Sequence, residues 1–267
     1  RVIPILGKEF IPKEFLYRHL PEWRENVQKY IRDNKLKYHF INSHYWDAGV
    51  ASQPLAEALG VTHVHTPHSL GIWKKQQMEE DQQENEDSFD EQFNFSDRIR
   101  HETDLYKACD IVTATSPCQI DVLKEEYNLA AERIRLIPPG YDDSRFFPIS
   151  ESTRRRVRQE FRYGADEHVI ACIGRLARNK GFDLLIDAFS IVAERDPNAV
   201  IRMAVGAESS DPSDDELLSS LFDQIAGYGL EDRVTVYESL ADEVMPDFYR
   251  AADVFVLPSR YEPIGMT

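Results

Sequence analysis

Short apolar runs that favour β-structure alternate with helix-like stretches along most of this 267-residue chain. Repeated strand–helix–strand units of this kind predict parallel sheets covered by helices on both faces. The expected strands are 38–42, 61–65, 111–114, 134–137, 169–173, 199–205, 234–236 and 254–257. The expected helices are 48–59, ending at Gly60, then 98–108, 182–193, 214–228 and 247–252, and one that starts at Pro117 with Ser116 as its N-cap.

The segment 138–152 interrupts this alternation with three prolines, two aspartates and a glycine, which is typical of an interdomain linker. We therefore expect two doubly wound, Rossmann-like α/β domains, 1–145 and 146–267, facing each other across a cleft. In such sheets ligands bind beyond the carboxyl ends of the strands. The run Val254–Leu257 is almost wholly apolar, as in a strand buried on both faces.

The chain is strongly acidic, with a formal net charge of −16, and this field opposes general binding to nucleic acid or to anionic membranes. No apolar run approaches the roughly 18 residues of a membrane span. Three cysteines without metal-ligand spacing favour reduced thiols and a cytoplasmic location. Because the chain begins at Arg1 and shows no signal sequence, we expect a fragment of a longer protein.

Eight acidic residues crowd into the thirteen positions from Glu79 to Glu91. A solvated or mobile loop is the favoured interpretation of this segment, and a lid over the cleft is the alternative. Its role cannot be assigned from the sequence.

The first candidate for chemistry is the segment Gly174–Gly181, which follows a buried strand and precedes a helix. Glycine allows a tight turn beside a ligand, and Arg175 and Lys180 extend from the carboxyl end of the strand. Two cations beside a helix N-terminus suit a diphosphate. Solvated side chains in an ordinary loop are the alternative.

The second candidate, Pro258–Thr267, also follows a strand. Glu262 is suited to accept hydrogen bonds from sugar hydroxyl groups, although a carboxylate that only faces water fits equally well. Gly265, Met266 and Thr267 are expected to begin a helix whose N–H groups point at an anion.

Histidines form a third cluster. His63 and His65 share one face of a strand, so a metal-dependent hydrolase is conceivable, but no carboxylate nearby completes a ligand set and we expect no metal site. His68 and His44 lie at strand ends, where each suits either contact with a substrate or a structural link between loops. The nearby cations are Lys74, Lys75, Arg98 and Arg100, which suit an acceptor that carries a phosphate.

Taken together, these motifs resemble the retaining GT-B glycosyltransferases of the sucrose-phosphate synthase family. Five motifs occur in the order and spacing of that family, namely Ser43–Gly49, His68–Gly71, Ile137–Gly140, Gly174-Arg175 with Lys180, and Glu262–Thr267. The stretches Phe10–Glu14, Ile41–Trp46 and Thr66–Lys75 resemble, within the family, enzymes that join mannose from GDP-mannose to fructose 6-phosphate.

The resemblance implies a nucleotide-sugar-binding second domain. There Arg175 and Lys180 bind the donor diphosphate and stabilise charge on the departing nucleotide. Glu262 holds the donor sugar, and backbone N–H groups from Gly265 to Thr267 touch the phosphates. Gly174 is a further donor-binding residue.

The resemblance also implies an acceptor-side first domain. His68 contacts the transferred sugar near the reacting carbon, Lys74 and Arg98 clamp the acceptor phosphate, and His44 is a further acceptor-side candidate. Such enzymes keep the anomeric configuration by front-face attack and need no cofactor or catalytic metal, because cationic side chains and helix dipoles supply the electrostatic stabilisation.

Three departures from the family pattern accompany the resemblance. The glycine-rich loop near the family's amino terminus is absent, a second glutamate eight positions beyond Glu262 would fall past Thr267, and Ile264 stands where phenylalanine is usual. We therefore expect a fold truncated at both ends and little or no activity from these 267 residues alone. The sequence leaves sucrose-phosphate synthase with UDP-glucose and a non-catalytic, two-lobed sugar-binding protein as alternatives, and it does not fix the oligomeric state.

Overall fold

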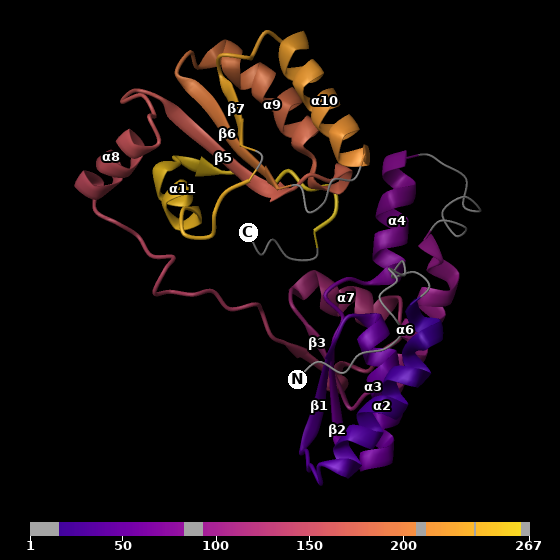
Figure 1. The fold of residues 1–267 in the computed structure, drawn as a ribbon. Coiled ribbons are helices and arrows are strands. Elements are labelled where there is room, and N and C mark those ends of the chain that lie inside the picture. Colours follow the sequence, from indigo (N-terminus) through magenta and orange to yellow (C-terminus); the bar gives the residue numbers. More distant parts are fainter. Residues whose placement is uncertain (1–15, 83–92, 207–211, 238, 263–267) are drawn as a thin grey trace. The chain divides into compact units, whose positions relative to one another are not determined.

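The computed structural model of the chain describes residues 16–82, 93–206, 212–237 and 239–262. The chain divides into two compact units, Arg1–Pro139 and Gly140–Thr267, and each is described by itself below (Figure 1).

The first unit is built on a parallel sheet in the order β1-β2-β3-β4. Its strands are β1 (Phe40–His44), β2 (Thr62–Thr66), β3 (Ile111–Ala114) and β4 (Ile134–Leu136). Its helices are η1 (Tyr17–His19), α2 (Leu20–Asp33), α3 (Trp46–Leu59), α4 (Gly71–Gln82), α6 (Phe95–Ala108), α7 (Pro117–Glu125) and η2 (Ala131–Arg133). Helix α3 contacts β1 and β2, and α7 contacts β3 and β4.

Local sequence explains two helix ends of this unit. Helix α3 stops at Gly60, which takes a left-handed φ of 64°, and its N–H bonds back to the last turn. Helix α7 starts at Pro117, and the Ser116 side chain accepts a hydrogen bond from the Gln119 N–H. Both sequence predictions are confirmed.

The second unit contains a parallel sheet in the order β7-β6-β5-β8. Its strands are β5 (His168–Arg175), β6 (Ala199–Gly206), β7 (Val234–Tyr237) and β8 (Val254–Phe255). Its helices are α8 (Glu151–Glu160), η3 (Arg178–Lys180), α9 (Phe182–Arg195), α10 (Pro212–Gly227) and α11 (Met245–Ala251). Helices α9 and α10 cover one face of this sheet, and α11 and α8 lie on the other (Figure 1).

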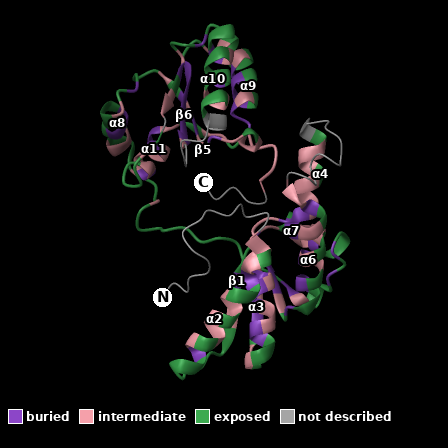
Figure 2. Cartoon of the chain, turned by 45° about the vertical axis from the view of Figure 1, so that its right-hand side comes forward, coloured by how far each residue is buried: buried purple, intermediate pink, exposed green. Residues whose placement is uncertain are grey.

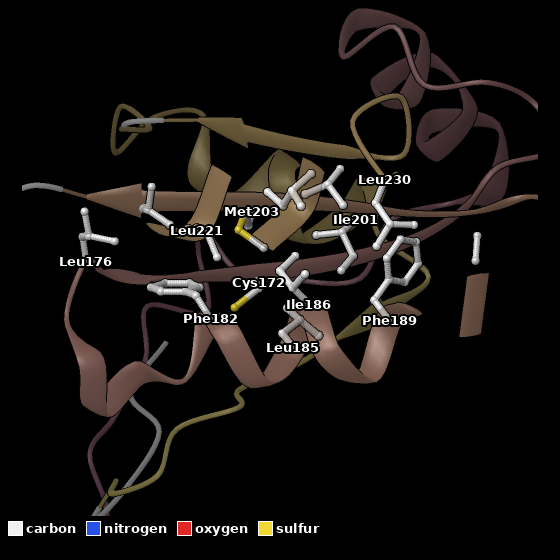
Figure 3. Packing of buried hydrophobic residues seen from close by; sticks show 14 residues of the cluster. Cys172, Leu176, Phe182, Leu185, Ile186, Phe189, Ile201, Met203, Leu221 and Leu230 are labelled. Carbon is white, nitrogen blue, oxygen red and sulfur yellow. The ribbon is translucent and has the colours of Figure 1, made fainter. Parts of the chain in front are cut away.

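Alternation along β5 and β6 divides the core of this unit between the two faces. Cys172, Ile201 and Met203 pack against Phe182 and Phe189 of α9 (Figure 3). The intervening residues join clusters on the opposite face that include Phe248 of α11. Strand β6 is buried along almost its whole length, as Figure 2 shows, because it is covered on both faces.

Two arginines hold α8 to the end of α11 and to the residue before β8. Arg154 donates to the carbonyls of Arg250 and Ala252 at 3.0 and 2.9 Å and pairs with Asp253 at 2.6 Å. Arg158 pairs with the same carboxylate at 3.1 Å, and this carboxylate also accepts the Val169 N–H at 2.7 Å. The carboxylate therefore joins α8 to the start of the central strand β5.

The structure differs from the sequence expectations in several elements. Helices α2, α4 and α8 were not predicted, and α4 extends to Gln82, so the first acidic residues of 79–91 are helical. Residues 83–91 of that segment lie outside the described residues. Strand β8 is short, and Val254 is 54% exposed because β8 pairs only with β5 in the described part of the chain, so the expectation of burial on both faces is wrong.

Two histidines belong to the buried interior of the first unit. His63 and His65 are 1% and 0% exposed, and Ser43 Oγ bridges them at 2.7 Å from His63 Nε2 and 2.8 Å from His65 Nδ1. His63 Nδ1 also contacts Gln53 Oε1 at 2.5 Å. The two rings share one face of β2, as the sequence predicts, and they serve as polar core residues.

Among the described residues, no helix combines the length and apolar character needed to cross a bilayer.

We expect the first unit to lose stability as the pH falls below 6.5. Burial lowers the pKa of His63 and, with its histidine neighbours, lowers the pKa of His65 to about 3 from an ordinary value of 6.5. Between these pH values the unfolded chain binds protons that the folded unit does not, so the free energy of unfolding decreases by about 1.4 kcal/mol per pH unit for each such proton. Urea unfolding followed by tryptophan fluorescence measures this, since all three tryptophans, Trp23, Trp46 and Trp73, lie in the first unit.

The comparison of pH 7.5 with pH 5.0 avoids the range in which most carboxylates titrate. His65→Asn is the matched variant, because its amide can still meet Ser43 but does not titrate. A pH dependence as steep in this variant as in the wild type would contradict the assignment.

Candidate functional site

The order of strands in the second sheet reverses at β5. The chain runs from β5 to β6 and β7 on one side, and then β8 returns to pair with β5 on the other. A parallel α/β sheet offers a ligand crevice at such a reversal, outside the carboxyl ends of the two strands. The loops 176–181 and 256–262, which follow β5 and β8, include most of the first sequence candidate for an anion site, Gly174–Gly181, and the described part of the second, Pro258–Thr267.

These two loops contact each other directly. The Arg260 N–H donates to the Asn179 carbonyl at 2.9 Å. The Arg260 guanidinium makes two hydrogen bonds to the Asp183 carboxylate, at 2.8 and 2.6 Å, and its hydrogen bonding lowers the pKa of Asp183. The Arg260–Asp183 pair was not predicted from the sequence, because 77 residues separate its members and only the fold brings them together.

A further contact between these two loops brings together two predicted site residues. Lys180 Nζ pairs with Glu262 Oε2, and both side chains are mostly covered, at 19% and 24% exposed. Ser259 Oγ also donates to Glu262 at 3.4 Å. An ammonium group has three N–H donors, so the pair does not exhaust the ability of Lys180 to donate to an anion.

The glycine that the turn requires is Gly181 rather than Gly174. Gly181 has a φ of 67°, and a Cβ atom there would overlap with the carbonyl oxygen of Pro258. Gly174 lies in β5, where a Cβ would make only ordinary contacts, the nearest 3.5 Å from Phe182. The tight turn and the close approach of the two loops therefore both depend on Gly181.

The other donor-side predictions stay predictions. Arg175 is the last residue of β5 and is exposed at the carboxyl end of the strand. Gly265, Met266 and Thr267 lie outside the described residues, as does the helix expected to begin there.

In the first unit, His44 and His68 lie at the carboxyl ends of the neighbouring strands β1 and β2. His44 Nδ1 is 2.8 Å from His68 Nε2, and the rings stack with centroids 5.1 Å apart. The Asn42 amide nitrogen lies 3.0 Å from His44 Nε2. With this amide as donor, His44 donates from Nδ1 to His68, and the neutral His68 ring carries its proton on Nδ1.

The backbone around this pair adopts left-handed conformations that are rare for side chains with a Cβ atom. Tyr45 and His68 have φ values of 66° and 59°. The Tyr45 N–H donates to the Thr66 carbonyl at 3.1 Å, and the Tyr45 ring lies 4.9 Å from that of His68. Such conformations cost about 1–3 kcal/mol each and concentrate at functional sites.

The predicted acceptor-side cations have different environments. Lys74 lies in the first turn of α4, with its Nζ 5.8 Å from the centre of the Phe93 ring. Arg98 is largely buried, and its guanidinium bonds to Glu102 at 2.8 Å and to the Ser69 carbonyl at 3.1 Å. The role of each in binding an acceptor stays a prediction.

The three histidines of the metal alternative lie in two different environments. Both ring nitrogens of His63 already have partners in Ser43 and Gln53, and His68 belongs to the separate pair with His44. Within the described ranges, no group of three or more histidine, cysteine, aspartate or glutamate side chains is arranged to hold a metal ion.

Comparison with known proteins identifies both units. The family model "Glycosyltransferase Family 4" matches residues 1–145, and "Glycosyl transferases group 1" matches residues 153–267. Mannosylfructose-phosphate synthase of Agrobacterium fabrum is 56% identical over 99% of the chain, and D-inositol 3-phosphate glycosyltransferase of Corynebacterium urealyticum is 27% identical over 97%. The chain spans 58% of the length of each of these relatives.

A solved structure has the same fold. Sucrose-phosphate synthase from Thermosynechococcus elongatus superimposes with a TM-score of 0.79 at 28% identity, covering 97% of this chain and 60% of that one. This match bears out the predicted GT-B architecture of two parallel-sheet α/β domains.

We expect Gly181→Ala to destabilise the second unit by about 2 kcal/mol or more, because it adds a Cβ against the Pro258 carbonyl at a left-handed φ. Gly227→Ala is the matched control, since a Cβ at that helical position meets nothing within 4 Å and should be neutral or stabilising. Urea unfolding followed by circular dichroism compares them. Equal stabilities of the two variants would refute the close approach.

We expect the pKa of His68 to lie below 6.5. Burial is the larger cause of this lowered pKa, and the neighbouring His44 is the smaller one. In His44→Gln the pKa of His68 should rise towards 6.5 while remaining below it. NMR titration of the ring protons measures both values, and the exposed His168, whose pKa is raised by its hydrogen bond to Asp196, serves as the internal reference on the other side of 6.5. A pKa of His68 above 6.5 would overturn this arrangement.

Proposed function

Because the chain belongs to the group 1 glycosyltransferases with the GT-B fold, we propose that its protein transfers a hexosyl group from a nucleotide sugar to a sugar phosphate with retention of configuration. The observation that carries this proposal is the contact between Lys180 and Glu262 at the strand reversal of the second sheet. It joins a cation suited to a diphosphate with a carboxylate suited to sugar hydroxyl groups, at the place where a parallel sheet binds ligands.

In this proposal the second unit binds the donor. Lys180 and Arg175 meet the diphosphate and stabilise the negative charge that grows on the departing nucleotide. Glu262 accepts hydrogen bonds from the donor sugar, and Arg260 holds its loop against α9 through Asp183. These cations supply the electrostatic stabilisation of the leaving group, and we propose that the reaction uses no cofactor or catalytic metal.

The first unit then binds the acceptor and the transferred sugar. His68 contacts the transferred sugar through the N–H that its pairing with His44 leaves at Nδ1. Lys74, with Arg98 and His44, lies on the side assigned to the acceptor phosphate. The leaving phosphate helps to deprotonate the acceptor hydroxyl, which attacks from the same face and so keeps the anomeric configuration.

We propose GDP-mannose as donor and fructose 6-phosphate as acceptor. The support is the 56% identity to a mannosylfructose-phosphate synthase. The structural likeness to a sucrose-phosphate synthase keeps UDP-glucose as the alternative donor. We further propose a cytoplasmic protein, in keeping with its free cysteines.

The test is nucleotide release by the protein at its natural length, with GDP-mannose and UDP-glucose compared side by side on fructose 6-phosphate. Release of GDP and formation of a mannosylated sugar phosphate are expected, with much less turnover of UDP-glucose. The 267-residue chain, assayed in parallel, tests the expectation that it is weakly active. Absence of GDP or UDP release with any hexose phosphate would refute the proposed function.

Replacing the donor-side cation tests the site itself. Lys180→Ala should lower kcat by about a hundredfold, because it removes one charge-assisted contact to the developing negative charge. Lys124→Ala changes an exposed lysine of α7 in the same way and should leave kcat unchanged. Similar rates for both variants would exclude Lys180 from the donor site.

A further inference from the structure

The loop after β2 is held by side chains that come from distant parts of the chain. The buried carboxylate of Glu102, on α6, accepts a hydrogen bond from the Gly71 N–H at 2.8 Å. The Tyr127 hydroxyl accepts one from the Ile72 N–H at 3.2 Å. These are the first two N–H groups of α4, which have no partner within their own helix.

These side chains form one network. The Tyr127 hydroxyl donates to Glu102 Oε2, and Arg98 Nε donates to Glu102 Oε1 at 2.8 Å. Arg98 also donates hydrogen bonds to the Ser69 carbonyl at 3.1 Å and to the Ser69 hydroxyl at 3.3 Å. The Gly71 N–H, the Tyr127 hydroxyl and the Arg98 guanidinium thus all donate to Glu102, whose side chain is 0% exposed.

The approach of Glu102 to the helix is close. A Cβ atom at Gly71 would lie 2.8 Å from Glu102 Oε2, so a larger residue here would displace the carboxylate from its present place. Leu70, next to it, is 0% exposed. The backbone from Ser69 to Ile72 is therefore fixed by hydrogen bonds and by packing.

This fixed backbone lies between two predicted site residues. His68 precedes it with a φ of 59°, and Lys74 follows it, with its N–H bonded to the Leu70 carbonyl at 2.9 Å. We propose that Tyr127 and Glu102 are positioning residues that set the place of His68 and Lys74 by capping the start of α4. This inference rests on the proposed function, in which these two side chains meet the transferred sugar and the acceptor phosphate.

Tyr127→Phe removes only the hydroxyl that links Ile72 to Glu102. Tyr106→Phe is the matched control, because Tyr106 is equally buried, its ring lies 4.9 Å from that of Tyr127, and its hydroxyl has no hydrogen-bond partner among the described residues. Both variants are made in the protein at its natural length. Urea unfolding verifies that each one folds.

We expect Tyr127→Phe to lower kcat by about tenfold or more and to raise the KM for fructose 6-phosphate, since small displacements of reacting groups have large effects on rate. Its Kd for GDP should stay unchanged, because the predicted nucleotide contacts lie in the second unit. Hydrogen exchange at Gly71 and Ile72 should become faster in this variant alone. Tyr106→Phe should match the wild type in kcat, KM, Kd and hydrogen exchange.

Wild-type kcat and KM in Tyr127→Phe would overturn the inference, and so would an equal loss of activity in both variants, which would indicate general damage to the core. If the wild type transfers no sugar, the proposed function fails, and hydrogen exchange alone decides whether the network holds the loop. Unchanged exchange at Gly71 and Ile72 in Tyr127→Phe would then overturn it.

Discussion

Pairing of β5 with a parallel strand on each side is the constraint on which the second unit depends. Because β8 returns to the side opposite β6, the loops after β5 and β8 emerge next to each other. Asp253 fixes this return by accepting the Val169 N–H at the start of β5. Gly181 then lets the two backbones approach closely enough for Lys180 to reach Glu262.

The first unit uses buried polar groups for a similar purpose. Ser43, His63 and Gln53 satisfy one another beneath the sheet, and Glu102 receives donors from three directions at the start of α4. Buried polar groups cost free energy unless they are paired, so such networks tolerate few alternative arrangements. The loop after β2, in which His68 has a positive φ, is thereby held in one conformation.

Much of this architecture could be predicted from the sequence, because alternating apolar runs, Gly60 and the Ser116-Pro117 cap act locally. Helix α8 could not, since its buried face is formed by Val157 with Arg158, and an arginine does not register in a hydrophobic pattern. The apolar run at β8 suggested a fully covered strand, whereas coverage depends on neighbouring strands rather than on the run itself.

The same distinction applies to the candidate sites. Lys180, Glu262, His44 and His68 follow strands, so their location at strand ends could be predicted. The residues that hold these side chains and their loops in place could not be predicted. Arg260 contacts Asp183, 77 residues away in the sequence, and Tyr127 contacts Glu102, 25 residues away. No local sequence pattern indicates either contact. The glycine-containing motif was recognised, but only the backbone angles distinguish Gly181 from Gly174.

The attachment of α8 has a consequence for how the second unit forms. Arg154 bonds to Asp253, 99 residues later in the sequence, and to carbonyls nearly as distant. During synthesis α8 therefore emerges long before Asp253, and these contacts form only after Asp253 has been made. Its contacts with Tyr163, Gly164 and Glu167, which follow it closely in the sequence, do not have to wait. The contacts of high sequence separation, by contrast, carry a large loop-closure entropy and slow the folding reaction. The attachment of α8 to Asp253 is thus a late event in folding, and a nascent chain that stops short of Asp253 lacks these ion pairs.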